Sequence, residues 1–184
     1  MEIATLAGGC FWCTEAIFKR LKGVTAVISG YAGGDVKNPT YHEISAGQTG
    51  HAESIKITFN PKVISYQEIL GVFWHLHDPT TINRQGSDSG TQYRSIIFYH
   101  SQKQKRMAEQ SKRQIAESGL YKDPIVTQIV PYTTFYKAED YHQNYYERNK
   151  DYPYCKLMID PKLQKLMTEF KDVTKPQESR RSIC

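Results

Sequence analysis

Apolar residues recur along the chain with two alternating periods, and together they predict an ordered series of strands and helices. Short apolar runs or strict alternation predict strands at residues 3–6, 24–29, 54–59, 94–99 and 125–130. Helical spacing predicts helices at 14–21, 101–118, 138–149 and 161–170, and one more that begins at Ser65. This order is typical of an α+β fold, in which helices pack against a mixed sheet to form two layers.

Local signals support the ends of two of these helices, and two long segments carry no predicted element. Ser65 and Glu68 form a capping box ahead of an apolar run, and Gly119 follows a predicted helix end. The segments 30–52 and 77–93 are rich in Gly, Tyr, His and acidic residues. Loops of that length inside a compact domain are usually functional, so we expect both to contribute to a site.

Length and composition indicate one folded domain. The 184 residues suffice for a sizeable core, and the hydrophobic (39%) and charged (23%) fractions are those of an ordinary globular protein. We expect a single catalytic domain over residues 1–171 and a weakly ordered tail over 172–184. No apolar run is long enough to cross a bilayer and no secretory signal is visible, so we expect a cytoplasmic protein without membrane contact.

The net charge is +5, and one basic cluster lies between residues 103 and 113. A nucleic-acid site would need a basic face interleaved with base-stacking aromatic residues. We interpret the cluster as the solvated face of the predicted helix and expect no nucleic-acid partner. No predicted face is strongly apolar and exposed, which favours a monomer.

Four cysteines lie at positions 10, 13, 155 and 184, a count that outside an oxidising compartment indicates catalytic or metal-binding thiols. The Cys10-x-x-Cys13 spacing is compatible with a thioredoxin-like redox pair, although that motif normally has a βαβ context. It is also compatible with half of a zinc site, but Cys155 and Cys184 are solitary and a structural site needs two more ligands. We expect no metal and no organic cofactor.

Cys10 stands where a predicted strand passes through Gly8 and Gly9 towards a predicted helix. A helix N-terminus offers unpaired N–H groups and the positive end of the helix dipole, which favour a thiolate and lower the pKa of the thiol. The adjacent Phe11 and Trp12 suit a small apolar group such as a methyl or a thioether. The alternative is an inert buried cysteine whose aromatic neighbours belong to the core.

Acidic and phenolic side chains in and beside the two long segments are candidate proton donors. Glu53 shares the face of Ile55 in its predicted strand, and an apolar pocket would raise the pKa of its carboxyl so that it acts as an acid near neutral pH. Tyr41 and Tyr93 would donate phenolic hydrogen bonds. Each has a structural alternative, namely a surface carboxylate for Glu53 and half-buried packing for the tyrosines.

Three other polar residues have both a functional and a structural interpretation. Asp88 lies in a Gly/Ser-rich segment, where it either contacts a ligand or forms a local turn. His51 and His142 are candidate bases, although lone histidines are usually structural.

Several separate segments together resemble one enzyme family. They are "GGCFWCTEA", "GYAGG", "NPTYHEISAGQTGHAESIKITFNP", "FWHLHDPTTINRQGSDSGTQYRSIIFY" and "AEDYHQNYY", and they resemble peptide methionine sulfoxide reductase A. The match runs in order from Leu6 to Cys155 and includes rare aromatic and glycine positions. Chance is therefore a poor explanation for it.

The resemblance implies a two-layer α/β sandwich of ferredoxin-like topology with irregular segments that wrap around it. It implies reduction of the S epimer of methionine sulfoxide, free or in proteins. The roles it implies are a nucleophile (Cys10), a pocket for the S-methyl group (Phe11 and Trp12), a shell around the sulfoxide oxygen (Glu53, Tyr41 and Tyr93) and a further substrate contact (Asp88).

The same resemblance implies a second thiol and an external reductant. Attack by the Cys10 thiolate, with Glu53 as acid, would leave a sulfenic acid that another cysteine converts to a disulfide, and thioredoxin or a similar dithiol would restore the enzyme. We rank Cys155 first for this step, then Cys13, then Cys184. The family pattern places resolving cysteines in a glycine-rich tail, whereas the residues after Cys155 are helical in pattern.

Two other functions are compatible with the motif around Cys10. One is general thiol–disulfide exchange by Cys10 and Cys13, and the other is non-catalytic binding of methionine-rich segments beside Phe11 and Trp12. Neither needs a proton donor, so the residues around Glu53 and Tyr93 favour the reductase.

Overall fold

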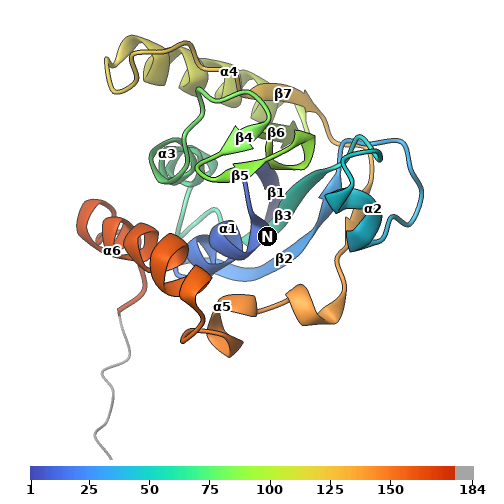
Figure 1. The fold of residues 1–184 in the computed structure, drawn as a ribbon. Coiled ribbons are helices and arrows are strands. Elements are labelled where there is room, and N and C mark those ends of the chain that lie inside the picture. The colour runs from blue at the N-terminus through green and yellow to red at the C-terminus, as the bar shows by residue number, and fades with distance from the viewer. Residues whose placement is uncertain (177–184) are drawn as a thin grey trace, which may run out of the picture.

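The computed structural model describes residues 1–176, which form a six-stranded mixed sheet with helices packed against it (Figure 1). The strands lie in the order β7-β6-β1-β3-β2-β8, and all neighbours are antiparallel except β6 and β7, which are parallel. Their bounds are β1 Glu2–Ala7, β2 Val24–Ala32, β3 Ala52–Phe59, β6 Ile96–Tyr99, β7 Gln128–Pro131 and β8 Phe135–Lys137. A separate hairpin pairs β4 (Arg84–Gln85) with β5 (Asp88–Ser89).

The helices differ in length and in what they cover. The longer ones are α1 Phe11–Phe18, α3 Tyr66–Leu76, α4 Gln102–Glu117 and α6 Asp160–Glu169, and the short ones are α2 Tyr41–Ser45 and α5 Tyr145–Arg148. Single turns occur at η1 Thr91–Tyr93, η2 Asp140–His142 and the π-helical η3 Cys155–Ile159. Helix α1 packs on β2 and β3, while α4 packs on β6 and β7. No helix in the described part of the chain is long and apolar enough to cross a membrane.

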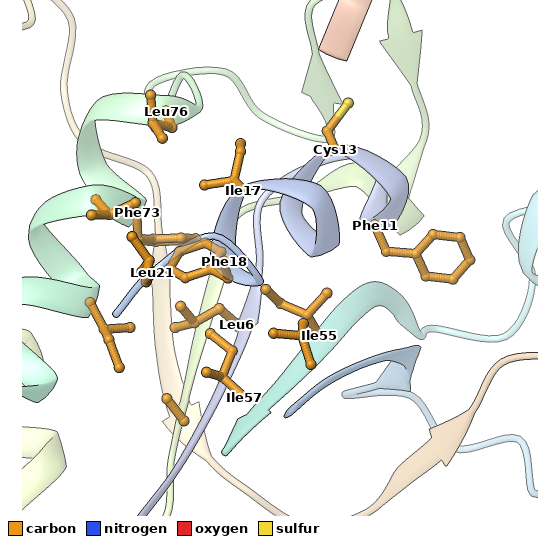
Figure 2. Close-up of a cluster of buried hydrophobic side chains, with 14 of the residues drawn as sticks. Leu6, Phe11, Cys13, Ile17, Phe18, Leu21, Ile55, Ile57, Phe73 and Leu76 are labelled. Atoms are coloured by element: carbon orange, nitrogen blue, oxygen red, sulfur yellow. The ribbon is translucent and has the colours of Figure 1, made fainter. Parts of the chain in front are cut away.

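Two hydrophobic clusters occupy opposite faces of the sheet, because successive side chains of a strand point in opposite directions. Leu6 and Ile97 belong to the large cluster beneath α1 and α3, whereas Ala7 and Ile96 belong to the smaller one. Figure 2 shows the large cluster, where side chains from α1, α3 and the strands meet. The Cys13 sulfur, on α1, points away from the centre of this cluster.

The α+β architecture and the mixed sheet agree with the sequence-based prediction, but several elements differ in extent. The helix predicted to begin at residue 14 begins at Phe11, and the strand predicted at 125–130 begins at Gln128. The segment predicted as one helix, 138–149, is instead η2 and α5, because Asn144 adopts a left-handed backbone (φ 56°) between them. The Asn144 N–H donates to Glu15 Oε1 at 2.9 Å, a long-range contact that periodicity does not reveal.

The predicted loops contain short elements that hydrophobic periodicity missed. Helix α2 lies within 30–52, and its signal was a second capping box, in which Thr40 and Glu43 bond each other's backbone N–H groups. The hairpin β4–β5 and the turn η1 lie within 77–93. Strand β8 has only three residues, which is too short for an alternating pattern to stand out.

The C-terminal part of the chain returns to α1. Helix α6 begins at Asp160 and ends at Glu169, one residue from each predicted bound, and it packs against α1 and α3. In the segment expected to be a weakly ordered tail, Thr174 pairs with Leu21 and the Lys175 N–H donates to Arg20 O at 2.7 Å. Residues 177–184, with Cys184, lie outside the described residues.

Candidate active site

Cys10 occupies the N-cap of α1, where β1 turns into the helix through two glycines. Its carbonyl oxygen accepts from the N–H groups of Cys13 and Thr14 at 3.1 and 3.3 Å, which starts the helix. Gly9 takes a φ of 86°, and a Cβ there would collide with the side chain of Gln85. A glycine is therefore required at this turn for both backbone and steric reasons.

The electrostatics of Cys10 differ from the sequence-based expectation. We expected the helix N-terminus to lower the pKa of the thiol, but Cys10 is only 7% exposed and burial raises its pKa well above the usual 9.0. The neighbouring Cys13 side chain and the negative charge of Glu53 raise it further. Desolvation outweighs the helix dipole here, so the surroundings of Cys10 favour the protonated thiol.

Glu53 lies next to the start of α1 and is almost completely buried. It is 2% exposed, which excludes the alternative of a surface carboxylate, and its Oε2 accepts from the Phe11 N–H at 3.0 Å. Burial raises the pKa of the carboxyl to about 8, although the bond from Phe11 opposes the rise. The carboxyl is therefore mostly protonated at neutral pH and can donate a proton.

The two aromatic residues after Cys10 lie in different surroundings. Phe11 is fully buried and packs on Tyr31 and on the His142 ring, with centroids 5.8 and 5.0 Å apart. Trp12 is half-buried and stacks face to face on Tyr145 at a centroid separation of 3.7 Å. Phe11 thus belongs to the core, while Trp12 leaves part of its indole exposed at the edge of the site.

His142 holds the indole of Trp12 in place. Its Nδ1 accepts from Trp12 Nε1 at 3.0 Å, and burial lowers the pKa of the imidazole. A neutral imidazole with an acceptor nitrogen suits that bond. His51, the other candidate base, accepts from the Gly34 N–H through Nδ1 and contacts Val36 O through Nε2 at 2.8 Å. His51 therefore ties the backbone of a loop together and has no free nitrogen for proton transfer.

Tyr41 and Tyr93 come from separate segments and share the electrostatic surroundings of Glu53. Tyr41 is the first residue of α2 and Tyr93 the last of η1, and both are half-buried. Burial first, and then the charge of Glu53, raise the pKa of each phenol above the usual 10.0. The charge of Cys10 acts in the same direction on both. Both phenols therefore remain protonated hydrogen-bond donors.

Asp88 is the first residue of β5, in the β4–β5 hairpin. It is linked to the Cys13 thiol through Tyr154, a residue that the sequence analysis did not single out. Asp88 Oδ2 accepts from Tyr154 Oη at 3.0 Å, and Tyr154 Oη lies 3.9 Å from Cys13 Sγ. The signal for Tyr154 was the dense run of tyrosines just before Cys155. That run has no helical or strand period, so only tertiary contact distinguishes one of its tyrosines from another.

Cys13 and Cys155 are both buried near this tyrosine. Cys13 is 2% exposed and Cys155 is fully buried at the first position of η3. The charge of Cys13, after burial, raises the pKa of Cys155, and α1 packs directly against η3. Within residues 1–176, no group of three or more His, Cys, Asp or Glu side chains is arranged to hold a metal ion.

Comparison with known proteins identifies the family. The family model described as peptide methionine sulfoxide reductase matches residues 2–174. A protein of Sulfolobus acidocaldarius, named peptide methionine sulfoxide reductase MsrA, is 58% identical over 172 residues, 94% of this chain and 97% of that protein. A protein of the same name from Thermus thermophilus is 53% identical over 175 residues, 95% of this chain and 98% of that protein.

Solved structures give the same result. Mxr1 of Saccharomyces cerevisiae in its reduced form is similar with a TM-score of 0.77 and 36% identity, over 84% of this chain and 88% of that one. The structure of Mxr1 in complex with Trx2 is similar with a TM-score of 0.55 and 29% identity, over 78% and 84%. The fold and these matches define an oxidoreductase. The chain belongs to the peptide methionine sulfoxide reductase family.

Proposed function

We propose that this chain reduces the S epimer of methionine sulfoxide to methionine, free or within proteins, with Cys10 as the nucleophile. Two separate kinds of reductase reverse methionine oxidation, one for each sulfoxide epimer. The observation that supports the proposal most directly is a buried carboxyl, Glu53, whose pKa of about 8 keeps it protonated beside the helix start that carries Cys10. A disulfide exchanger or a binding module would have no use for an acid there.

The proposed reaction balances between the thiol and the sulfoxide. Glu53 gives its proton to the sulfoxide oxygen, which makes the sulfur more electrophilic, and Cys10 loses its proton to the carboxylate as it attacks. The bond between Cys10 and the substrate sulfur then breaks as the oxygen moves from that sulfur to Cys10, so that methionine leaves reduced and Cys10 becomes a sulfenic acid. Because the pKa of Cys10 is raised, its thiol stays protonated and unreactive when no substrate is bound. Once Glu53 has given its proton to a substrate oxygen, its carboxylate can accept the proton of Cys10.

The remaining predicted residues would position the substrate. Trp12 would contact the S-methyl group, with Phe11 behind it, and Tyr41 and Tyr93 would donate hydrogen bonds to the oxygen as negative charge develops on it. Asp88 would hold the substrate from the β4–β5 hairpin. Burial first, and then the charges of Glu53 and Cys10, raise the pKa of both phenols, which supports placing these four residues in one site.

Regeneration would use a second cysteine and an external dithiol. We propose Cys155 as the thiol that resolves the sulfenic acid on Cys10 by forming a disulfide with it, and thioredoxin as the reductant. The first rests on the burial of Cys155 against α1, and the second on the complex that the related Mxr1 forms with Trx2. No metal or organic cofactor enters this reaction. We further propose a monomer that acts in the cytoplasm, with residues 1–171 as its catalytic domain.

The core topology is proposed to be ferredoxin-like, with the C-terminal segment wrapped around it. In support, β1, α1, β2, β3, α3 and β6 follow one another along the chain, and their strands lie in the order β6-β1-β3-β2. This is a split β-α-β arrangement repeated once. Support for the wrap comes from α5 and α6, which pack against α1.

Single-turnover reduction tests the function. The protein is mixed with each pure epimer of methionine sulfoxide without added reductant, and methionine is counted per enzyme. We expect one equivalent from the S epimer, none from the R epimer, and none from Cys10→Ser with either. Cys184→Ser is the control, because it also removes one thiol. It should form as much methionine per enzyme as the unaltered protein. Full turnover by Cys10→Ser would refute the proposed nucleophile.

A further inference from the structure

One carboxylate that the proposed reaction does not use reaches three parts of the site. Glu139 lies between β8 and η2, and its side chain is 34% exposed. Its Oε1 accepts from the Tyr41 N–H at 2.8 Å, and its Oε2 accepts from the Tyr31 hydroxyl at 2.8 Å. Its Oε2 also lies 3.9 Å from His142 Nε2. One side chain thus joins α2, β2 and η2, which lie far apart in the sequence.

We propose that Glu139 is a positioning residue for sulfoxide reduction, which holds Tyr41 so that its hydroxyl meets the sulfoxide oxygen. Through its second oxygen, the same carboxylate supports the aromatic wall formed by Phe11 and Trp12. This inference rests on the proposed function, because it gives Glu139 a part in the same reaction. Glu139 itself would touch neither the substrate nor a reacting atom.

Helix α2 depends on such a contact because it is short and has little packing of its own. The structure describes all five of its residues, and of these Ile44 alone is buried. The N–H of a first helical residue has no partner within the helix, and the cap residue Thr40 bonds the N–H of Glu43 instead. Glu139 supplies the acceptor for the Tyr41 N–H. The place from which the Tyr41 side chain leaves α2 is therefore set by this carboxylate.

The backbone that carries Glu139 is held on the sheet. The N–H of Ala138, the preceding residue, donates to Ser29 O on β2 at 3.0 Å. The side-chain amide of Gln143 bonds both the N–H and the carbonyl of the same Ser29, at 3.1 and 2.9 Å. A support on a regular element positions a site more precisely than one on a loop. Glu139 therefore connects the sheet to the helix that carries Tyr41.

The charge of Glu139 suits its two partners. Partial burial acts to raise the pKa of this carboxyl, but the bonds from the Tyr41 N–H and the Tyr31 hydroxyl outweigh it and lower the pKa below the usual 4.5. Glu139 is therefore a carboxylate at neutral pH. An ionised carboxylate only accepts hydrogen bonds, and both of its partners here donate one.

The second oxygen acts on residues that lie behind the aromatic wall. Tyr31 is fully buried, and its ring packs on Phe11 with the centroids 5.8 Å apart. His142 is fully buried too, and because its Nδ1 accepts from Trp12 Nε1, the neutral imidazole carries its hydrogen on Nε2. Within residues 1–176 that Nε2 has no hydrogen-bond partner. The negative charge of Glu139, 3.9 Å away, favours a hydrogen on this nitrogen and so supports the tautomer that holds Trp12.

A double-mutant cycle with Tyr41 tests this role. The unaltered protein, Glu139→Ala, Tyr41→Phe and the variant with both substitutions each react once with increasing concentrations of the S epimer of methionine sulfoxide. The saturating rate of methionine formation and the half-saturating concentration are measured separately, and thermal unfolding shows whether each protein is folded. Asp140→Asn is the matched control, because it removes a carboxylate from the next residue that bonds only the exposed Lys137.

We expect Glu139→Ala to lower the saturating rate about tenfold, because a misplaced donor loses much of its effect. In the Tyr41→Phe background the same substitution should cost less than about threefold, since the hydroxyl through which Glu139 acts is already gone. The half-saturating concentration should rise in both backgrounds, because both lose the support of Phe11 and Trp12. Asp140→Asn should match the unaltered protein in both measurements.

Four results would contradict the inference. Equal loss of rate in the two backgrounds, or no loss in either, overturns the positioning of Tyr41 and leaves the reductase intact. An unchanged half-saturating concentration overturns the support of the aromatic wall. Absence of methionine from the unaltered protein overturns the proposed function and the role of Glu139 with it. If Glu139→Ala does not fold, Glu139→Asp keeps the charge but draws the carboxylate back by one methylene group, and the same cycle then decides between these results.

Discussion

The substitution Glu53→Gln tests two effects of the buried carboxyl separately: its effect on folding stability and its proposed role as the general acid. The amide keeps an oxygen that can accept from the Phe11 N–H and has nearly the same shape, but it cannot give up a proton. General acid catalysis contributes about 10²–10⁴-fold to a rate, so single-turnover methionine formation should fall by about that factor. The unaltered protein should also lose activity above about pH 8, where Glu53 ionises.

The same substitution should stabilise the fold at alkaline pH. Burial raises the pKa of Glu53 from 4.5 to about 8, about 3.5 units, and each unit corresponds to about 1.4 kcal/mol, or about 5 kcal/mol in all. The pKa of Glu53 is higher in the folded protein than in the unfolded chain, so binding of a proton to this carboxyl stabilises the fold. This stabilisation is complete below about pH 4.5 and is lost as the pH rises to about 8. Glutamine does not titrate, so the free energy of unfolding of the variant does not fall over this pH range through residue 53.

Denaturant unfolding at several pH values measures this difference. Between about pH 6 and about pH 9, the free energy of unfolding of Glu53→Gln should gain about 3 kcal/mol relative to the unaltered protein. Glu15→Gln is the matched control, because Glu15 is also buried but pairs with Lys19 at 2.8 Å. That variant should lose stability and keep catalysis. A Glu53→Gln protein with full activity, or with a stability difference that does not grow with pH, would refute the reasoning.

Four further substitutions test other parts of the structure. Tyr41→Phe and Tyr93→Phe should each lower the single-turnover rate by about 10²-fold, the usual cost of one oxyanion donor, with little change in unfolding; equal rates would exclude them as donors. Ser65→Ala removes the N-cap of α3 and should cost about 1 kcal/mol of unfolding free energy at unchanged activity, as measured by denaturant titration. Gly34→Ala places a Cβ against the backbone of His51 and should cost about 1–3 kcal/mol, seen as a lower thermal midpoint; an unchanged midpoint would contradict the close approach.

Local pattern in the sequence was enough to locate most of the main elements. Alternation over 54–59 predicted a strand, and β3 covers Ala52–Phe59. The capping box at Ser65 is present as predicted, because it involves only neighbouring residues. Cys10 lies at a helix N-cap because Gly9, with a positive φ, permits the turn that precedes it.

Tertiary structure decided the properties that depend on distant segments. The pKa of Cys10 is raised, against the expectation from its helix, because desolvation comes from everything packed around it. The break at Asn144 depends on Glu15, far away in sequence, and the contact between Cys13 and Tyr154 joins residues 141 positions apart. Periodicity reports which side of an element faces inward, whereas burial of a charge and proximity of two thiols depend on what the rest of the chain brings there.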